Sequence, residues 1–195
     1  MLNDTSSLRT YFETRRSGRP RDMVAPGPNE DELSAILALA ARTPDHGKLV
    51  PYRFVIVGDD QREALADLFA AAVRDVDPEV RQAKLEKVCA KAHYAPSLVV
   101  LISSPIRDHK IPVWEQELAA GAVGMNLLHA AHAYDYVGAW ITGDQAYAPA
   151  VTEAFCKDGE RIAGYFFLGS PSADLVERER PDMDAIVTRW RPPTA

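Results

Sequence analysis

The stretch Leu98-Val99-Val100-Leu101-Ile102 is apolar at every position, and it contains the β-branched residues that strands favour. An apolar run without alternation is typical of a strand that is buried on both faces of a sheet. We therefore predict a strand over residues 98–104 in the interior of the fold. The run is far too short to cross a membrane, which takes about 20 residues.

Patterns on either side of this strand predict the other elements. Apolar runs rich in Val, Ile and aromatic residues predict strands over 53–58, 137–142 and 162–169. Apolar residues at helical spacing predict helices over 5–15, 30–42, 60–75, 79–93, 113–135 and 148–156. Asn29 and Glu32 have the spacing of a capping box at the start of the second helix, and Pro44 ends that helix.

The order of these elements predicts a layered α/β or α+β fold. Neither an internal repeat nor a linker divides residues 1–195, which indicates one domain. Residues 171–195 are rich in proline and are expected to be extended. Such a tail has little to pack against in one compact subunit, so it favours a dimer in which each tail wraps around the partner.

Composition and charge exclude several classes of protein. The 195 residues are 47% hydrophobic and 26% charged, as in ordinary globular proteins, which excludes a disordered or collagen-like chain. A net charge of −6 makes the chain a poor electrostatic partner for nucleic acid. Cys89 and Cys156 form no CxxC motif, and residues 1–9 lack the apolar core of a signal peptide. These features predict a cytoplasmic protein that binds neither nucleic acid nor membrane.

The sequence lacks several motifs that would identify an active site. It contains no GxGxxG, GxxxxGK[ST], HExxH or GxSxG pattern, which excludes a Rossmann fingerprint, a P-loop, a zincin site and a nucleophile elbow. His129 and His132 share a helix face, but no ExxH carboxylate accompanies them. We interpret them as ordinary helix histidines and predict no metal site.

Two basic segments have the side chains to bind a ligand. Arg15-Arg16-Ser17 lies at the end of the first helix, where guanidinium groups and a hydroxyl would suit a phosphate. A solvated basic turn has the same composition. The segment 42–48 contains Arg42 and His46, which could donate hydrogen bonds to an anionic or carbonyl-rich ligand. Alternatively, Arg42 only complements the dipole at a helix C-terminus.

Two further segments follow or precede strands. Residues 109–117 join the buried strand to the longest predicted helix, so they either border a ligand or supply acids to that helix's N-terminus. Residues 138–143 form a strand that ends in Thr142-Gly143, where backbone N–H groups become accessible. Trp140 in this strand is either a core residue or a stacking partner for a cofactor. Small residues between 119 and 126 allow a backbone or a flat ring to approach the long helix closely.

In this order, and with Tyr165-Phe166-Phe167-Leu168-Gly169 after them, the four segments resemble the nitroreductase family, in particular its short bacterial members. The resemblance extends from about residue 7 to 190. It implies an α+β fold with a central, mostly antiparallel sheet flanked by helices. It also implies a homodimer with FMN at the subunit interface and a domain-swapped C-terminal tail.

The resemblance further implies which residues bind the cofactors. The phosphate and ribityl end of FMN would contact Arg15, Arg16 and Ser17. The second loop would contact the flavin through Arg42 and His46. The isoalloxazine would lie against Trp140, Ile141 and Thr142, where a backbone N–H approaches N5. The nicotinamide side would be formed by Gly121, Ala122, Val123, Gly124, Met125 and Asn126. Arg178 and Arg180 resemble, less closely, basic tail residues that reach the phosphate in larger relatives.

The implied chemistry is hydride transfer from NADH or NADPH to tightly but non-covalently bound FMN. A ping-pong mechanism would then pass the hydride from N5 to a small-molecule acceptor, such as a nitroaromatic, a quinone or an unsaturated carbonyl. No catalytic side chain is expected, because the flavin carries the hydride. Two alternatives stay open: a flavin enzyme of the same fold that performs dehydrogenation or flavin destruction, and a flavin-free dimeric binding module.

The sequence departs from the family pattern at two places. Val50-Pro51-Tyr52 stands where members often have Gln-Pro-Trp, and Ile141 stands where minimal members often have Arg. A cation beside the flavin stabilises its anionic reduced form. We therefore expect Ile141 to shift the flavin potential or the substrate preference without abolishing FMN binding.

Overall fold

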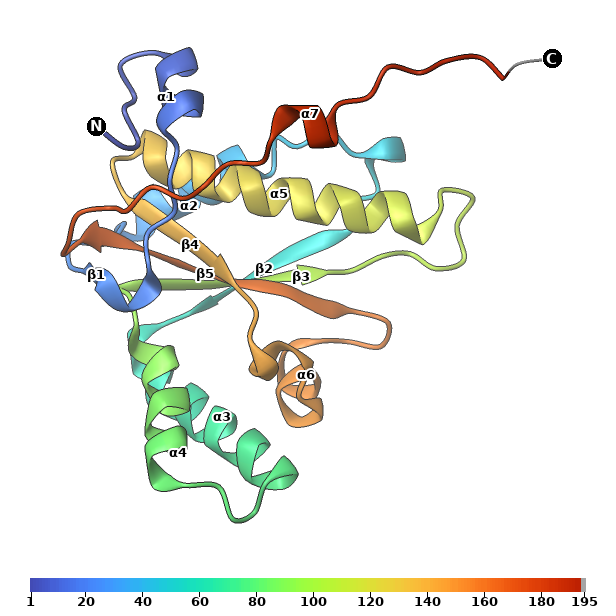
Figure 1. The fold of residues 1–195 in the computed structure, drawn as a ribbon. Coiled ribbons are helices and arrows are strands. Elements are labelled where there is room, and N and C mark those ends of the chain that lie inside the picture. Colours follow the sequence, from blue (N-terminus) through green and yellow to red (C-terminus); the bar gives the residue numbers. More distant parts are fainter. Residues whose placement is uncertain (194–195) are drawn as a thin grey trace.

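An antiparallel sheet forms the centre of the computed structural model, which describes residues 1–193 (Figure 1). Its strands are β1 (Met23–Val24), β2 (Tyr52–Val57), β3 (Ser97–Ser103), β4 (Val137–Ile141) and β5 (Arg161–Pro171). β5 pairs with β3 and with β4, β2 pairs with β3, and β1 pairs with the last residues of β5. β2 and β4 therefore lie at the two edges of the sheet.

Strand β3 lies in the interior of the sheet, as its unbroken apolar run predicts. All seven of its residues are buried, because β2 and β5 flank it and helices cover both faces. Along β5, alternate side chains enter different cores. Phe167 packs with Phe69 on one side of the sheet, whereas Phe166 packs with Leu127 on the other side.

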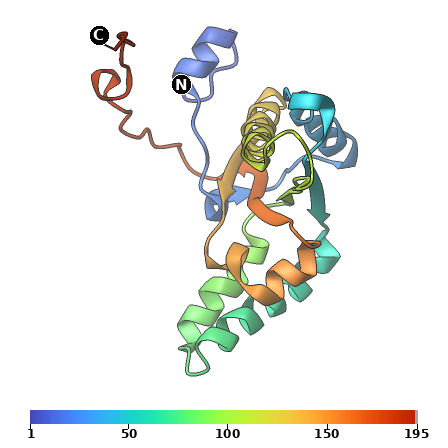
Figure 2. The ribbon, with the colours of Figure 1, turned by 90° about the vertical axis from the view of Figure 1, so that its right-hand side faces the viewer.

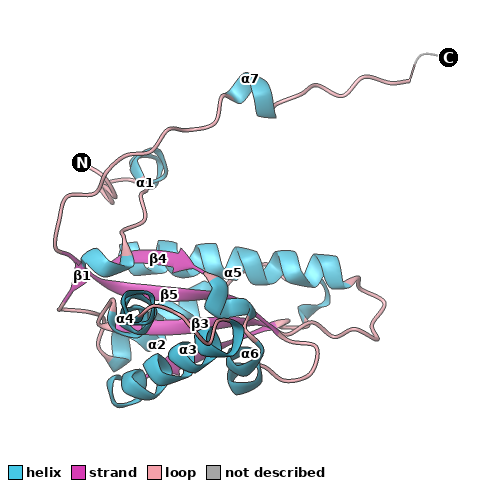
Figure 3. Ribbon diagram, turned by 60° about the horizontal axis from the view of Figure 1, so that its bottom comes forward, coloured by secondary structure: helices cyan, strands magenta, loops and turns pink. Residues whose placement is uncertain are grey.

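Helices cover the two faces of the sheet in two separate layers (Figures 1 and 3). One face is covered by α2 (Glu30–Ala40) and α5 (Val113–Ala133). The other face is covered by α3 (Arg62–Val76), α4 (Gln82–Cys89) and α6 (Pro149–Phe155). Asn29 and Glu32 form the predicted capping box at the start of α2. No helix among residues 1–193 is both long enough and apolar enough to span a membrane.

The two ends of the chain project from one side of this body (Figures 2 and 3). Helix α1 (Leu8–Thr14) begins later than predicted, because the Ser7 side chain caps it by accepting a hydrogen bond from the Thr10 N–H. The tail after β5 is mostly extended, as expected, but it contains a short helix, α7 (Met183–Ile186).

Two predicted elements differ in extent from the structure, and one short strand lies outside the predictions. The helix predicted over 79–93 consists of α4 and a 3₁₀ turn, Ala90–His93. The predicted strand over 162–169 continues to Pro171, because β1 pairs with its last two residues. The two residues of β1 are too few to produce a readable pattern.

Candidate functional site

A cluster of arginines forms where the segment after α1 meets the tail. The Arg16 Nε donates a hydrogen bond to the Val176 carbonyl at 2.7 Å, and the Arg180 Nη2 donates to the Arg15 carbonyl at 3.2 Å. Partial burial, together with the positive charges of Arg178, Arg180 and Arg15, lowers the pKa of Arg16. Burial is the largest cause of this pKa shift, and the Glu177 carboxylate opposes it. Three further guanidinium groups near Arg16 are donors that an anion could use.

A cavity of about 300 Å³ lies beside this cluster. Ser17, Gly18 and Val176 line it together with three arginines, Arg16, Arg19 and Arg178. Three carboxylates, Asp22, Asp174 and Glu177, also line it. The Arg15 Nη1 lies 3.4 Å from the Ser17 hydroxyl, so the three residues of the predicted phosphate segment are grouped. Guanidinium groups and a hydroxyl are the donors that a phosphate monoester requires.

The end of β4 presents the residues expected to contact an isoalloxazine. The Trp140 indole stacks on the Phe166 ring at a centroid distance of 5.1 Å, and its Nε1 donates to the Ala163 carbonyl at 2.9 Å. These contacts fix the indole against the sheet, yet 37% of the residue stays exposed. Trp140 is therefore both packed against the core and accessible to a ligand. Ile141 and Thr142 are partly exposed beside it.

Lys91 reaches the same place, although no sequence pattern pointed to it. Its Nζ donates to the Gln145 side-chain oxygen at 2.8 Å, and it would lie 3.4 Å from a Cβ built on Gly143. Burial lowers the pKa of Lys91. In the sequence Lys91 is one of several lysines in a charged segment, and only the fold brings it next to Thr142-Gly143.

The second loop packs along α5. The His46 Nδ1 lies 2.6 Å from a carboxylate oxygen of Glu115 in the first turn of α5, and the Asn126 amide nitrogen donates to the Thr43 hydroxyl at 2.7 Å. The structure thus joins two predicted segments, because Glu115 belongs to 109–117. The side chains of Arg42 and His46 are exposed, which leaves their donors accessible.

The predicted nicotinamide-side stretch on α5 is divided between two sides of the helix. Val123 is fully buried, and a Cβ on Gly124 would lie 2.8 Å from Phe166 and 3.1 Å from Trp140. These two residues face the sheet, because a helix presents only some of six consecutive residues on one side. Gly121, Ala122, Met125 and Asn126 remain partly or fully accessible.

The structure does not bring Arg15 and His46 together within one chain, although Thr43 of the second loop bonds Asn126, three positions before His129. Arg15 lies near His129 and His132, whose pKa values are lowered by burial and by its charge, whereas His46 contacts Glu115. Glu115 and His132 are 17 positions apart on α5, which corresponds to about 26 Å along a helix. This distance is longer than one extended FMN molecule.

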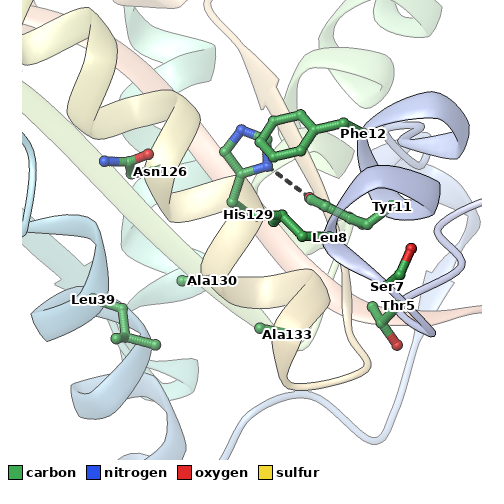
Figure 4. A pocket seen from close by; sticks show the side chains of 10 residues that line it. All are labelled: Thr5, Ser7, Leu8, Tyr11, Phe12, Leu39, Asn126, His129, Ala130 and Ala133. Carbon is green, nitrogen blue, oxygen red and sulfur yellow. Dashed lines mark hydrogen bonds between the residues drawn. The ribbon is translucent and has the colours of Figure 1, made fainter.

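A larger cavity, of about 690 Å³, lies between α1, α2 and α5 (Figure 4). Leu8 and Phe12 of α1, Leu39 of α2 and Ala130 of α5 form its apolar lining, and Tyr11 and His129 lie at hydrogen-bond distance within it. Of the described residues that line this cavity, only Asn126 is a predicted site residue. Residues 1–193 contain no cluster of side chains suited to a metal ion.

The sequence of this chain is similar to a known protein family. The nitroreductase family model matches residues 13–170. A Haemophilus influenzae protein named "Putative NAD(P)H nitroreductase" is 34% identical over 172 residues, which cover 87% of this chain and 91% of that protein.

Solved structures share the fold. A nitroreductase-like family protein from Bacillus cereus has a TM-score of 0.80 at 18% identity, covering 97% of this chain and 99% of that chain. A Desulfovibrio desulfuricans structure described as a "putative nitroreductase in complex with FMN" has a TM-score of 0.66 at 19% identity, covering 88% and 91%. The α+β fold with an antiparallel sheet between helices is therefore the one that the sequence resemblance implied.

Proposed function

The chain belongs to the nitroreductase family, and we propose that it is an FMN-dependent oxidoreductase that takes hydride from NADH or NADPH. Its acceptor would be a small electrophilic molecule, such as a nitroaromatic, a quinone or an unsaturated carbonyl. The arginine cluster at the segment after α1 carries this proposal, because it supplies an anion site where the family resemblance requires a phosphate site.

The residues of the cluster fit the phosphate end of FMN. Arg15, Arg16 and Ser17 would donate hydrogen bonds to the phosphate oxygens, and Arg178 and Arg180 would add charge from the tail. Burial and the neighbouring arginines lower the pKa of Arg16, which Glu177 offsets in part. A bound dianion would form further ion pairs with these arginines.

Other residues would position the ring system. When bound, FMN supplies the hydride-accepting atom N5 and passes the hydride on to the acceptor. Trp140, Ile141 and Thr142 would border the ring, and the backbone at Thr142-Gly143 would present an N–H to it. Lys91 would place an ammonium beside this segment, where the family often has the arginine that Ile141 replaces. Gly121, Ala122, Met125 and Asn126 would border the nicotinamide.

We propose a homodimer with the cofactor at its interface. One FMN cannot contact both Arg15 and His46 of the same chain, because about 26 Å of α5 separates their surroundings. In a dimer, one FMN could contact Arg15 of one subunit and His46 of the other. Trp114 and Leu118 on α5 are 66% and 51% exposed, and Leu8 and Phe12 on α1 are 74% and 59% exposed. Apolar side chains that lie bare in one chain are typical of a protein interface.

The end of the tail would cross to the partner subunit. Val176 and Arg180 contact the chain's own Arg16 and Arg15, so the crossing would begin after Arg180. Strand β2 has one unpaired edge, and Ile56 on it is exposed. Exposed sheet edges are places where another chain adds a strand. The apolar side chains of Ile186, Val187 and Trp190 would supply such a segment.

The proposal extends to organisation and compartment. Residues 1–195 would act as one domain, since the family model covers most of the chain, α1 contacts α5, and the tail contacts the segment after α1. The free Cys89 and Cys156 suit a reducing compartment such as the cytoplasm.

A steady-state assay with a quinone separates this proposal from its alternatives. NAD(P)H oxidation that needs both FMN and the quinone, with parallel double-reciprocal plots at several quinone concentrations, is the expected result. Loss of the flavin chromophore during turnover would instead support flavin destruction. A protein that binds no FMN and oxidises no NAD(P)H would support the flavin-free module.

A further inference from the structure

Tyr11 is the buried residue through which α1 contacts α5, and Phe12 beside it also meets the His129 ring, at a centroid distance of 5.1 Å. Of the seven residues of α1, Tyr11 alone is buried, whereas Leu8 and Phe12 are exposed. The Tyr11 hydroxyl lies 2.7 Å from the Nδ1 of His129 and 2.7 Å from the Nδ1 of His132 (Figure 4 shows the bond to His129). Both imidazole rings also meet the phenol ring edge to face, at centroid distances of 5.5 and 5.7 Å. We call these three residues the Tyr11 clamp.

The number of protons determines how the Tyr11 clamp is bonded. A phenol has one proton, so it can donate to one imidazole and must accept from the other. The Nε2 of His132 is buried and has no partner among residues 1–193. Burying an unprotonated ring nitrogen without a partner costs less free energy than burying an N–H group without an acceptor. His132 therefore donates its Nδ1–H to Tyr11, Tyr11 donates to the Nδ1 of His129, and His129 keeps its proton on Nε2.

We propose that Tyr11 is a positioning residue for the phosphate segment: by holding the end of α1 on the last turns of α5, the Tyr11 clamp sets the place of Arg15-Arg16-Ser17. α1 ends at Thr14, so the phosphate segment follows the clamped helix directly. The part of this proposal that concerns FMN rests on the proposed function. The part that concerns the attachment of α1 stands on the contacts alone.

The Tyr11 clamp requires both imidazoles to be neutral. Burial lowers the pKa of His132 to about 4, and burial together with the Arg15 charge lowers the pKa of His129. Arg15 is near both rings, and His129 also acts on His132. Asp135, Asp174 and the first residue, Met1, share a cavity with His132. When α1 is detached, the histidines regain pKa values nearer 6.5. Acidification below about pH 6.5 therefore favours the detached form, and this effect grows until the pH reaches the lowered pKa values.

Hydrogen exchange of flavin-free protein tests the attachment. Tyr11→Phe keeps the ring and removes the hydroxyl, and Tyr147→Phe, at an exposed tyrosine, is the matched control. We expect the protection factors of the α1 amides, which correct for the intrinsic effect of pH on exchange, to be about three- to tenfold lower in Tyr11→Phe at pH 7.5. The wild-type protection factors should approach these lower values at pH 5. Unchanged exchange in Tyr11→Phe, or wild-type exchange free of this pH effect, would overturn the proposal.

FMN affinity tests the positioning role. Tyr11→Phe should weaken FMN binding about three- to tenfold at pH 7.5, and it should flatten the pH dependence that wild type shows between pH 7.5 and 5. Faster α1 exchange with unchanged FMN affinity would overturn the positioning role. A wild-type protein that takes up no FMN would overturn the proposed function, and the exchange data would still decide the clamp.

Imidazole NMR of the wild-type protein gives a measurement that needs no variant. At pH 7.5 the nitrogen shifts should show opposite tautomers, with the proton on Nδ1 in His132 and on Nε2 in His129. The same tautomer in both rings would contradict the Tyr11 clamp.

Discussion

The side chain of Arg16 donates a hydrogen bond to the carbonyl of Val176, 160 positions later in the sequence, at 2.7 Å. This bond brings the tail back to the segment after α1 and gathers Arg178 and Arg180 beside Arg15 and Arg16. The two ends of the chain thus form one basic site. The phosphate site in our proposal therefore depends on the tail as well as on the first helix.

Removing one guanidinium from this site should weaken FMN binding. Arg15→Ala deletes a donor to the phosphate, and hydrogen bonds to charged groups contribute about 1.5–3 kcal/mol, which corresponds to roughly a tenfold to hundredfold weaker affinity. The measurement is an FMN titration followed by fluorescence. Arg9→Ala is the matched control, because Arg9 is exposed on α1 and pairs with Glu13. Equal affinities for both variants would contradict the phosphate assignment.

Charge beside the flavin should set its reduction potential. Lys91→Gln removes the ammonium near Gly143 and should lower the midpoint potential of bound FMN, whereas Ile141→Arg adds a cation and should raise it. For a two-electron couple, about 30 mV corresponds to 1.4 kcal/mol, so shifts of tens of millivolts are expected. Lys87→Gln on the exposed face of α4 is the control. Equal midpoint potentials in wild type and all three variants would show that Lys91 and position 141 do not lie beside the flavin.

Two glycines of α5 should respond to alanine in opposite directions. A Cβ on Gly124 would lie 2.8 Å from Phe166, so Gly124→Ala should destabilise the protein by about 1–3 kcal/mol through overpacking. A Cβ on Gly121 meets no described atom within 4 Å, so Gly121→Ala should stabilise the helix by up to about 1 kcal/mol. Thermal unfolding compares the two. A stabilised Gly124→Ala protein would show that Trp140 and Phe166 are not packed against α5.

The proposed dimer should depend on the outer face of α5. Leu118→Glu places a charge on an exposed apolar position beside Trp114, and it should convert the dimer to a monomer in light scattering. Val76→Glu at the end of α3 adds the same charge to an exposed apolar residue of the opposite helix layer and should leave the dimer intact. If Leu118→Glu stays dimeric, another surface forms the interface.

Glu160 should make stability depend on pH. Hydrogen bonds from Arg53, the Lys157 N–H and Ser104 lower the pKa of Glu160 to about 2. Its folded-state pKa is depressed, so its contribution to stability is present above the unfolded value of about 4.3 and is lost as pH falls from there toward 2. Glu160→Gln should therefore destabilise the protein at pH 7 and by only about half as much at pH 3. The exposed Glu153→Gln is the control in denaturant titrations. A difference between wild type and Glu160→Gln that is equal at both pH values would contradict this account.

Elements with a strong local pattern could be predicted from the sequence. The apolar run of β3 and the capping box of Asn29 and Glu32 appear as expected, because burial on both faces and helix capping are determined by neighbouring residues. β1 and α7 have two and four residues, too few for a periodic signal.

The parts of the site that depend on tertiary contacts could not be predicted. Lys91 joins the end of β4 only through the packing of α4, and nothing in its own segment indicates this. Val123 and Gly124 lie in a stretch of small residues. Such a stretch indicates close packing against α5, but the sequence does not show whether a ligand or the sheet packs there. The family resemblance names candidate site segments, whereas the separation of about 26 Å along α5 between the surroundings of Arg15 and His46 appears only in three dimensions.

The visible spectrum of the purified protein, recorded again after incubation with FMN and desalting, tests the central claim most directly. The account predicts the absorption bands of oxidised flavin at about one FMN per chain, retained through desalting. A colourless protein that releases all added FMN would contradict the account, because the arginine cluster would then have no flavin phosphate to bind.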